Sequence, residues 1–114
     1  MCHVLIIEDE PFVAIAIQEV LKEEGATSFA FAVTQAEAVE AALERRPELI
    51  TSDVRLIEGT GPCAVAQIHE RLGQVPVIFI TATPSQCEPC DPPGIVLDKP
   101  VRQQALRDAF HHMV

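Results

Sequence analysis

Five polar side chains that could act together on phosphate each follow an apolar segment of this sequence. They are Glu8, Asp9, Asp53, Thr81 and Lys99. Neighbouring carboxylates repel one another, so a site that gathers them favours a hard divalent cation such as Mg²⁺. Asp53 could then attack a phosphoryl donor while the metal neutralises charge on the transferred group. Lys99 and the Thr81 hydroxyl would bind the phosphate oxygens.

The segments before these residues have the length of strands. The apolar runs cover residues 4–7, 29–32, 49–52, 77–80 and 95–97. Most are continuously apolar, as expected of parallel strands that are covered on both faces. Helical patterns alternate with them, which predicts one α/β domain with a parallel sheet over residues 1–114. The carboxyl ends of the strands, and with them the five polar residues, would meet at one edge.

The helical patterns have recognisable boundaries. Pro11 opens the first and Gly25 closes it. Thr34 and Glu37 begin the second with the spacing of a capping box. The apolar face that we expect for this second helix is Ala36, Val39 and Leu43.

The fourth connection, residues 83–94, differs from the others because it contains four prolines. Each proline removes an amide donor and disfavours helix in the residue before it. We therefore expect an irregular loop with at most one helical turn. Cys87 and Cys90 lie in it with redox or zinc spacing, but no second ligand pair is near, so a dithiol switch and ordinary loop cysteines stay open.

Composition narrows the class of protein. The chain has 114 residues and a net charge of −9, which disfavours direct binding to nucleic acid or anionic membranes. No apolar run approaches the roughly 20 residues that span a bilayer, and Met1-Cys2-His3 does not begin a secretory signal. We expect a cytoplasmic protein with free thiols.

Together these motifs make the chain resemble the receiver domain of two-component response regulators, of the single-domain chemotaxis type. The resemblance covers essentially the full length. Its matching pieces are residues 4–11, Ser52 and Asp53, Gly61, residues 76–82 and residues 97–100. It implies a flavodoxin-like, doubly wound sheet of five parallel strands in the order 2-1-3-4-5, with the fourth helix short or replaced by the proline-rich loop.

The resemblance also implies a role for each site residue. Asp53 would be phosphorylated by a histidine kinase or a phosphotransfer protein. Asp9 and Asp53 would hold Mg²⁺ directly, with the Arg55 backbone carbonyl as a further ligand and Glu8 acting through water.

On the phosphate side, the resemblance implies that Thr81, Ala82 and Lys99 bind the phosphoryl group and form the switch. It also implies a cis bond between Lys99 and Pro100. The downstream partner would be another protein, and a homodimer stays open. The receiver would catalyse only its own phosphorylation and dephosphorylation.

Several residues depart from the family pattern. Val96 stands where the family often has an aromatic residue that swings inward on phosphorylation, and Val101 stands where Phe is common. Leu56-Ile57 replaces the usual Leu-Pro. These departures leave a degenerate receiver that acts as an adaptor as an alternative. A haloacid-dehalogenase-like phosphatase fits less well, because Arg55 occupies the position of its acidic catalyst.

Arg55 lies two residues after Asp53, so its side chain could reach over the site. One hypothesis is that it pairs with the phosphoryl group or with Glu8 and changes the lifetime of the phosphorylated form; a solvated arginine is the alternative. The Arg55→Ala variant should then dephosphorylate at a different rate from the wild type. Equal rates would refute the hypothesis.

Overall fold

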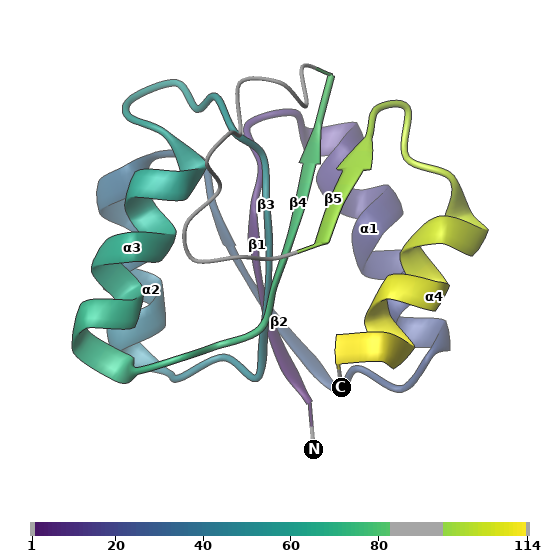
Figure 1. The fold of residues 1–114 in the computed structure, drawn as a ribbon, viewed down its shortest axis with the longest axis horizontal. Helices are drawn as coiled ribbons and strands as arrows, with labels where there is room; N and C mark the ends of the chain where they lie inside the picture. Colours follow the sequence, from purple (N-terminus) through teal and green to yellow (C-terminus); the bar gives the residue numbers. More distant parts are fainter. Residues whose placement is uncertain (1, 83–94, 114) are drawn as a thin grey trace.

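The computed structural model describes residues 2–82 and 95–113, and in this part of the chain it contains five strands and four helices (Figure 1). The strands are β1 (His3–Ile7), β2 (Ser28–Ala32), β3 (Leu49–Ser52), β4 (Val77–Thr81) and β5 (Ile95–Asp98). They form one parallel sheet in the order β2-β1-β3-β4-β5. The predicted flavodoxin-like sheet is confirmed.

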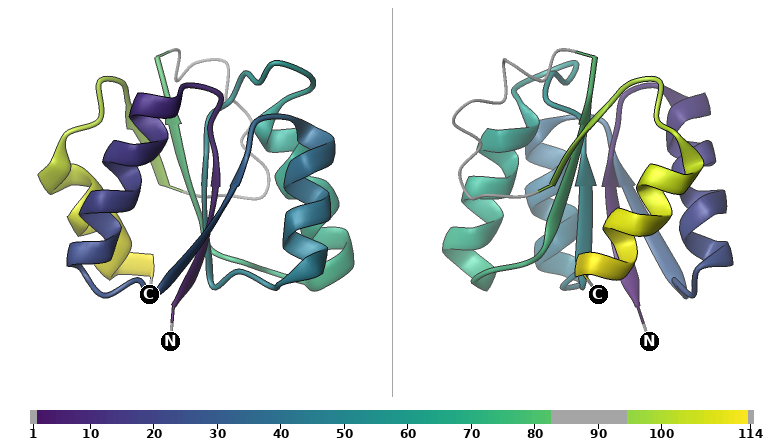
Figure 2. Two further views of the ribbon diagram at one scale, coloured as in Figure 1. Left: turned by 180° about the vertical axis from the view of Figure 1, so that it is seen from behind. Right: turned by 45° about the vertical axis from the view of Figure 1, so that its right-hand side comes forward.

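Helices cover both faces of this sheet. They are α1 (Pro11–Glu23), α2 (Gln35–Glu44), α3 (Gly61–Leu72) and α4 (Gln103–Met113). Figures 1 and 2 show α1 and α4 on one face and α2 and α3 on the other. No helix in the described part of the chain is long and apolar enough to cross a membrane. The proline-rich connection, with the question of a fourth helix and the two cysteines, lies outside the described residues.

Alternate side chains of the strands fill two separate cores, one on each face. The core toward α1 and α4 contains Val4, Ile6, Ile78 and Ile80. The core toward α2 and α3 contains Leu5, Ile7, Ile50 and Phe79. Burial on both faces explains why these strands are continuously apolar rather than alternating.

The predicted apolar face of α2 is wrong at two of its three positions. Ala36 is exposed and Leu43 is 44% exposed, whereas Ala38 and Ala42 are fully buried and Val39 is half-buried. Alanines carry little weight in a hydrophobic pattern, so the larger Leu43 directed the prediction to the wrong side. The small side chains let α2 pack closely on the sheet and on α3.

Candidate functional site

The carboxyl-terminal edge of the sheet gathers the polar residues that the sequence placed there. Glu8 and Asp9 follow β1, Asp53 follows β3, Thr81 ends β4 and Lys99 follows β5. The sheet continues into the site through main-chain hydrogen bonds. The Asp53 N–H donates to the Ile7 carbonyl and the Lys99 N–H to the Thr81 carbonyl, each at 2.9 Å. The positions of these residues are therefore set by the strand register.

The Lys99 ammonium lies at the centre of the site. It donates hydrogen bonds to Asp53 Oδ2 at 3.0 Å, to Glu8 Oε2 at 3.3 Å and to Glu10 Oε1 at 3.3 Å. The side chains of Lys99, Asp53 and Glu8 are only 13%, 11% and 1% exposed. Charges interact more strongly where little water reaches them. One ammonium faces three carboxylates, so the site keeps an excess of negative charge.

The surroundings of Glu8 and Lys99 raise the pKa of both side chains. Burial, with a smaller contribution from the charge of Asp53, outweighs the hydrogen bond from Lys99 and raises the pKa of Glu8 to about 7. Burial lowers the pKa of Lys99, but hydrogen bonds to Asp53 and Glu8 outweigh it and raise that pKa above its usual value. Lys99 therefore stays charged at neutral pH, whereas Glu8 titrates near it.

This titration predicts a pH dependence for the metal-free protein. Folded Glu8 keeps its proton up to about pH 7, but a glutamate in the unfolded chain loses it near about pH 4.3. The folded state binds more protons between these values, so the free energy of unfolding falls as pH rises through them. Urea unfolding in EDTA should show this fall for the wild type relative to Glu8→Gln. Parallel curves would contradict the shifted pKa.

The acidic residues of the site fit a magnesium ion. Glu8, Asp9, Glu10 and Asp53 each offer one carboxylate oxygen, and these oxygens lie within 4.8 Å of one another. Glu8 Oε1 is buried 3.1 Å from the Lys99 ammonium but accepts no hydrogen bond. Carboxylate oxygens are the ligands that Mg²⁺ prefers. Sequence reasoning missed Glu10, although it is the third acid in a row after β1.

The Asp53 carboxylate is oriented and faces a cavity. Its Oδ1 accepts a hydrogen bond from the Val54 N–H at 2.7 Å. The cavity, of about 250 Å³, is lined by Glu10, Asp53, Arg55, Thr81, Ala82 and Lys99. The predicted residues Arg55, Thr81 and Ala82 thus border the same space as Asp53, and their roles stay predictions.

The residues that flank this cavity differ in exposure. Thr81 is buried, while Ala82 and Arg55 are exposed. The bond between Lys99 and Pro100 is cis.

Gly61 lies against the main chain of Asp53. Its N–H donates to the Val54 carbonyl at 2.8 Å. A Cβ atom at this position would lie 1.8 Å from the Asp53 carbonyl oxygen and 2.3 Å from Ser52 Oγ. Only glycine fits here, which gives a steric reason for the glycine eight residues after Asp53.

The two valines that depart from the family pattern lie three residues before and two residues after Lys99. Val96 is 38% exposed on β5. Val101 is half-buried and packs against the core beneath α1 and α4. Neither is a ring that could swing, so no aromatic switch exists at these two positions.

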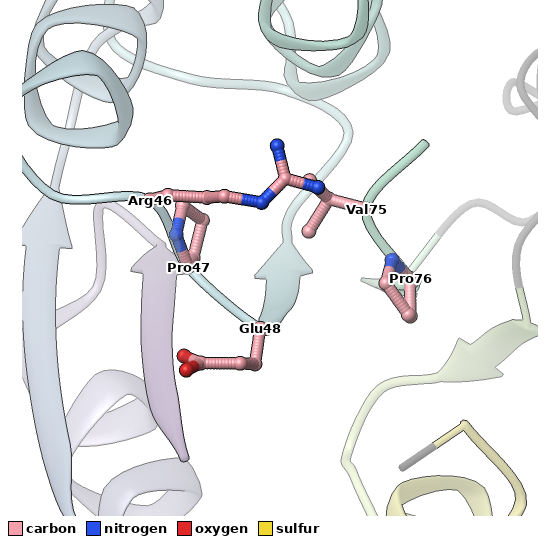
Figure 3. A pocket seen from close by; sticks show the side chains of 5 residues that line it. All are labelled: Arg46, Pro47, Glu48, Val75 and Pro76. Carbon is pink, nitrogen blue, oxygen red and sulfur yellow. The ribbon is translucent and has the colours of Figure 1, made fainter. Parts of the chain in front are cut away.

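A second hollow, of about 270 Å³, lies at the opposite edge of the sheet (Figure 3). It is lined by Arg46, Pro47, Glu48, Val75 and Pro76, which precede β3 and β4. Glu48 there accepts the His3 N–H at 2.7 Å. None of the predicted site residues lines this hollow, so the carboxyl-terminal edge is the candidate site.

Residues 4–111 match the family model of the response regulator receiver domain. The chain therefore belongs to this family, as the sequence resemblance indicated.

Two curated relatives and a solved structure are similar to it. Over 85 residues it is 38% identical to the phyllosphere-induced regulator PhyR of Methylorubrum extorquens, covering 74% of this chain and 32% of that protein. Over 87 residues it is 32% identical to the chemotaxis protein CheY of Bacillus subtilis, covering 75% of this chain and 72% of CheY. A crystal structure of a mutant of the anti-anti-sigma factor PhyR from Bartonella quintana superposes with a TM-score of 0.86 at 30% identity, covering 98% of this chain and 48% of that one. The match thus spans about a third of one PhyR and about half of the other.

Proposed function

We propose that this receiver domain is the phosphoacceptor of a phosphorelay, and that Asp53 carries the phosphoryl group. A histidine kinase, a phosphotransfer protein or a small phosphodonor would supply that group in a Mg²⁺-dependent reaction. One observation carries the proposal: the Asp53 carboxylate lies 3.0 Å from the Lys99 ammonium, belongs to the acidic cluster and faces a cavity. The proposed nucleophile, the proposed cation ligands and the proposed phosphate-binding charge therefore share one small space.

The chemistry follows from these neighbours. A carboxylate oxygen of Asp53 would bond to phosphorus while the bond from phosphorus to the donor's nitrogen or oxygen breaks. Bound Mg²⁺, held by Asp9 and Asp53, the Arg55 carbonyl and Glu8 through water, would supply neutralising charge for the transferred group. Lys99 would move its contact from the carboxylates to a phosphoryl oxygen. The hydrogen bond from the Val54 N–H keeps the attacking carboxylate oriented.

Phosphorylation adds about −1.5 to −2 charges at Asp53. Thr81, Ala82 and Lys99 border the same cavity, and the main chains of Thr81 and Lys99 are hydrogen-bonded. Attraction of Lys99 and the Thr81 hydroxyl to the new charge would therefore move the ends of β4 and β5 together. That movement is the proposed switch.

Beryllofluoride, which mimics an aspartyl phosphate, tests the switch. With Mg²⁺ it should slow amide hydrogen exchange at Thr81 and Ala82 in the wild type but not in Asp53→Asn. Unchanged exchange in both proteins would favour the phosphorylation-independent adaptor. Steady turnover of added phosphate esters would favour a phosphatase.

An exposed aromatic residue beside the site suggests where a protein phosphodonor would bind. Phe12 is 87% exposed and lines a groove of about 560 Å³ together with Val13, Ala16, Pro100 and Val101. We expect Phe12→Ser to slow phosphotransfer from a histidine donor protein roughly tenfold, since exposed aromatic anchors carry much of the binding energy. Phosphorylation by acetyl phosphate should be unchanged.

The control for this prediction is Leu43→Ser. Leu43 is also an exposed apolar side chain, but it lies on α2, whereas Phe12 lies on α1. Leu43→Ser should leave both reactions unchanged. If Phe12→Ser slowed phosphorylation by the histidine donor protein and by acetyl phosphate equally, Phe12 would affect the reaction at Asp53 and not the binding of the donor protein.

The likeness to PhyR favours a second candidate for the output. The Bartonella protein is described as an anti-anti-sigma factor, and this chain matches 48% of it. We infer that an anti-sigma factor is a candidate partner class for this receiver. Binding of such a factor, measured with and without beryllofluoride, tests this: dependence on beryllofluoride indicates a phosphorylation switch, and equal binding indicates an adaptor.

A further inference from the structure

The loop between β3 and α3, which directly follows Asp53, is held by the first residue of α2. The Gln35 N–H donates to the Glu58 carbonyl at 3.0 Å, and the Thr60 N–H donates to Gln35 Oε1 at 3.2 Å. Gln35 thus binds the loop through both its main chain and its side chain. Figures 1 and 2 show this loop at the same end of the molecule as the start of α2.

Hydrogen bonds inside the loop connect this contact to the site. Arg55 and Thr60 form an antiparallel bridge, and the Gly61 N–H donates to the Val54 carbonyl at 2.8 Å. Thr60, which Gln35 holds, therefore lies directly opposite Arg55. The main chain of Arg55 is the part of the loop that would supply a carbonyl ligand to the cation.

Gly59 packs directly against the side chain of Gln35. Gly59, at the turn of the loop, has φ +81°, a conformation that favours glycine. A Cβ atom on Gly59 would lie 2.3 Å from Gln35 Oε1 and 2.6 Å from Gln35 Cβ. The loop and the glutamine side chain are in direct contact, with no room for a bridging water between them at this point.

We propose that Gln35 is a positioning residue for the cation site: by holding Thr60, it fixes the main chain of Arg55 on the other side of the loop. The inference rests on the proposed function, in which the main-chain carbonyl of Arg55 is a ligand of Mg²⁺. Residues that orient metal ligands commonly change metal affinity when they are replaced. Gln35 touches neither the phosphoacceptor nor the reacting atoms.

The cap of α2 provides a matched control. The Thr34 hydroxyl oxygen accepts the Glu37 N–H at 3.1 Å, as the capping box predicts. In a capping box, the Glu37 carboxylate would in turn accept the N–H of Thr34. Here Glu37 Oε1 instead accepts the N–H of the preceding residue, Val33, at 3.0 Å. Thr34→Ala would therefore weaken the same helix end by about 1 kcal/mol. It would leave the Gln35 side chain and its bond to Thr60 in place.

The experiment compares the wild type with Gln35→Ala, Gln35→Glu and Thr34→Ala. The Kd for Mg²⁺ is obtained from the rise in the free energy of unfolding with Mg²⁺ concentration. Amide exchange of Thr60, measured in EDTA, reports on the hydrogen bond without any metal. Gln35→Ala should weaken Mg²⁺ binding roughly tenfold and speed exchange at Thr60. Gln35→Glu keeps the acceptor oxygen and should restore both, and Thr34→Ala should change neither.

Two outcomes would overturn the inference alone. Either Gln35→Ala binds Mg²⁺ like the wild type, or Thr34→Ala weakens binding as much as Gln35→Ala does, which would make the effect one of general helix stability. A wild type that gains no stability from Mg²⁺ contradicts the proposed function and the inference together. The wild-type measurement thus separates the two failures.

Discussion

Replacing Asp53 with asparagine is expected to abolish phosphorylation of this chain by acetyl phosphate. The Asp53 carboxylate lies 3.0 Å from the Lys99 ammonium, belongs to the acidic cluster and faces the cavity, and the Val54 N–H orients it. An amide is nearly the same size but is a poor nucleophile and a weaker cation ligand. Intact mass spectrometry should find one added phosphoryl group on the wild type and none on Asp53→Asn.

Asp98→Asn is the matched control for this variant. Asp98 ends β5, as Asp53 follows β3, and it directly precedes Lys99, but it is exposed and lies outside the acidic cluster. Asp98 is not expected to accept a phosphoryl group. The Asp98→Asn variant should therefore be phosphorylated like the wild type. An undiminished adduct on Asp53→Asn would show that the acceptor is a different residue.

Replacing Gly61 with alanine is expected to destabilise the fold and slow phosphorylation at the same time. The added Cβ would lie 1.8 Å from the Asp53 carbonyl oxygen and 2.3 Å from Ser52 Oγ, so the main chain of Asp53 has to move. Overpacking of this kind costs about 3 kcal/mol when the obstacle is backbone rather than a mobile side chain. Urea unfolding and the rate of reaction with acetyl phosphate measure the two effects.

Gly73→Ala separates loss of stability from loss of chemistry. Gly73 directly follows α3 as its C-cap, with φ +82° and ψ −166°, a conformation that other residues reach only at a cost of about 1–3 kcal/mol. A Cβ there meets nothing within 4 Å, so the damage stays local. This variant should lose stability but be phosphorylated at the wild-type rate. An equal loss of rate in both variants would indicate that Gly61 acts through stability alone.

Much of the fold could be predicted because burial on both faces leaves a strong signal in the sequence. The run at 77–80 is apolar throughout, and β4 adds only Thr81 to it. Once the strands are parallel, the residues that follow them must lie at one edge. This geometric necessity is why Asp53 and Lys99, 46 residues apart, could be placed together before their 3.0 Å contact was seen.

Other features depend on side-chain packing, which periodicity does not describe. Ala38 and Ala42 form the buried face of α2 because their small size suits a close contact. Glu10, beside Pro11 at the start of α1, looks in sequence like an ordinary charged residue, yet it reaches Lys99 at 3.3 Å.

The contact between Gln35 and the loop after β3 is likewise hidden from sequence reasoning. It joins residues 25 positions apart. It also depends on the close approach of Gly59 to the glutamine side chain. A glutamine at the start of a helix carries no pattern that would reveal such a partner.

The most direct test of the account is the intact mass of the wild-type chain after incubation with acetyl phosphate, in Mg²⁺ and in EDTA. With Mg²⁺, the chain should gain the mass of one phosphoryl group, because the cation offsets the repulsion between the donor and the carboxylates at Asp53. With EDTA, it should gain almost none. A chain that gains nothing in Mg²⁺, or gains equally in EDTA, would contradict the claim that Asp53 is a Mg²⁺-dependent phosphoacceptor.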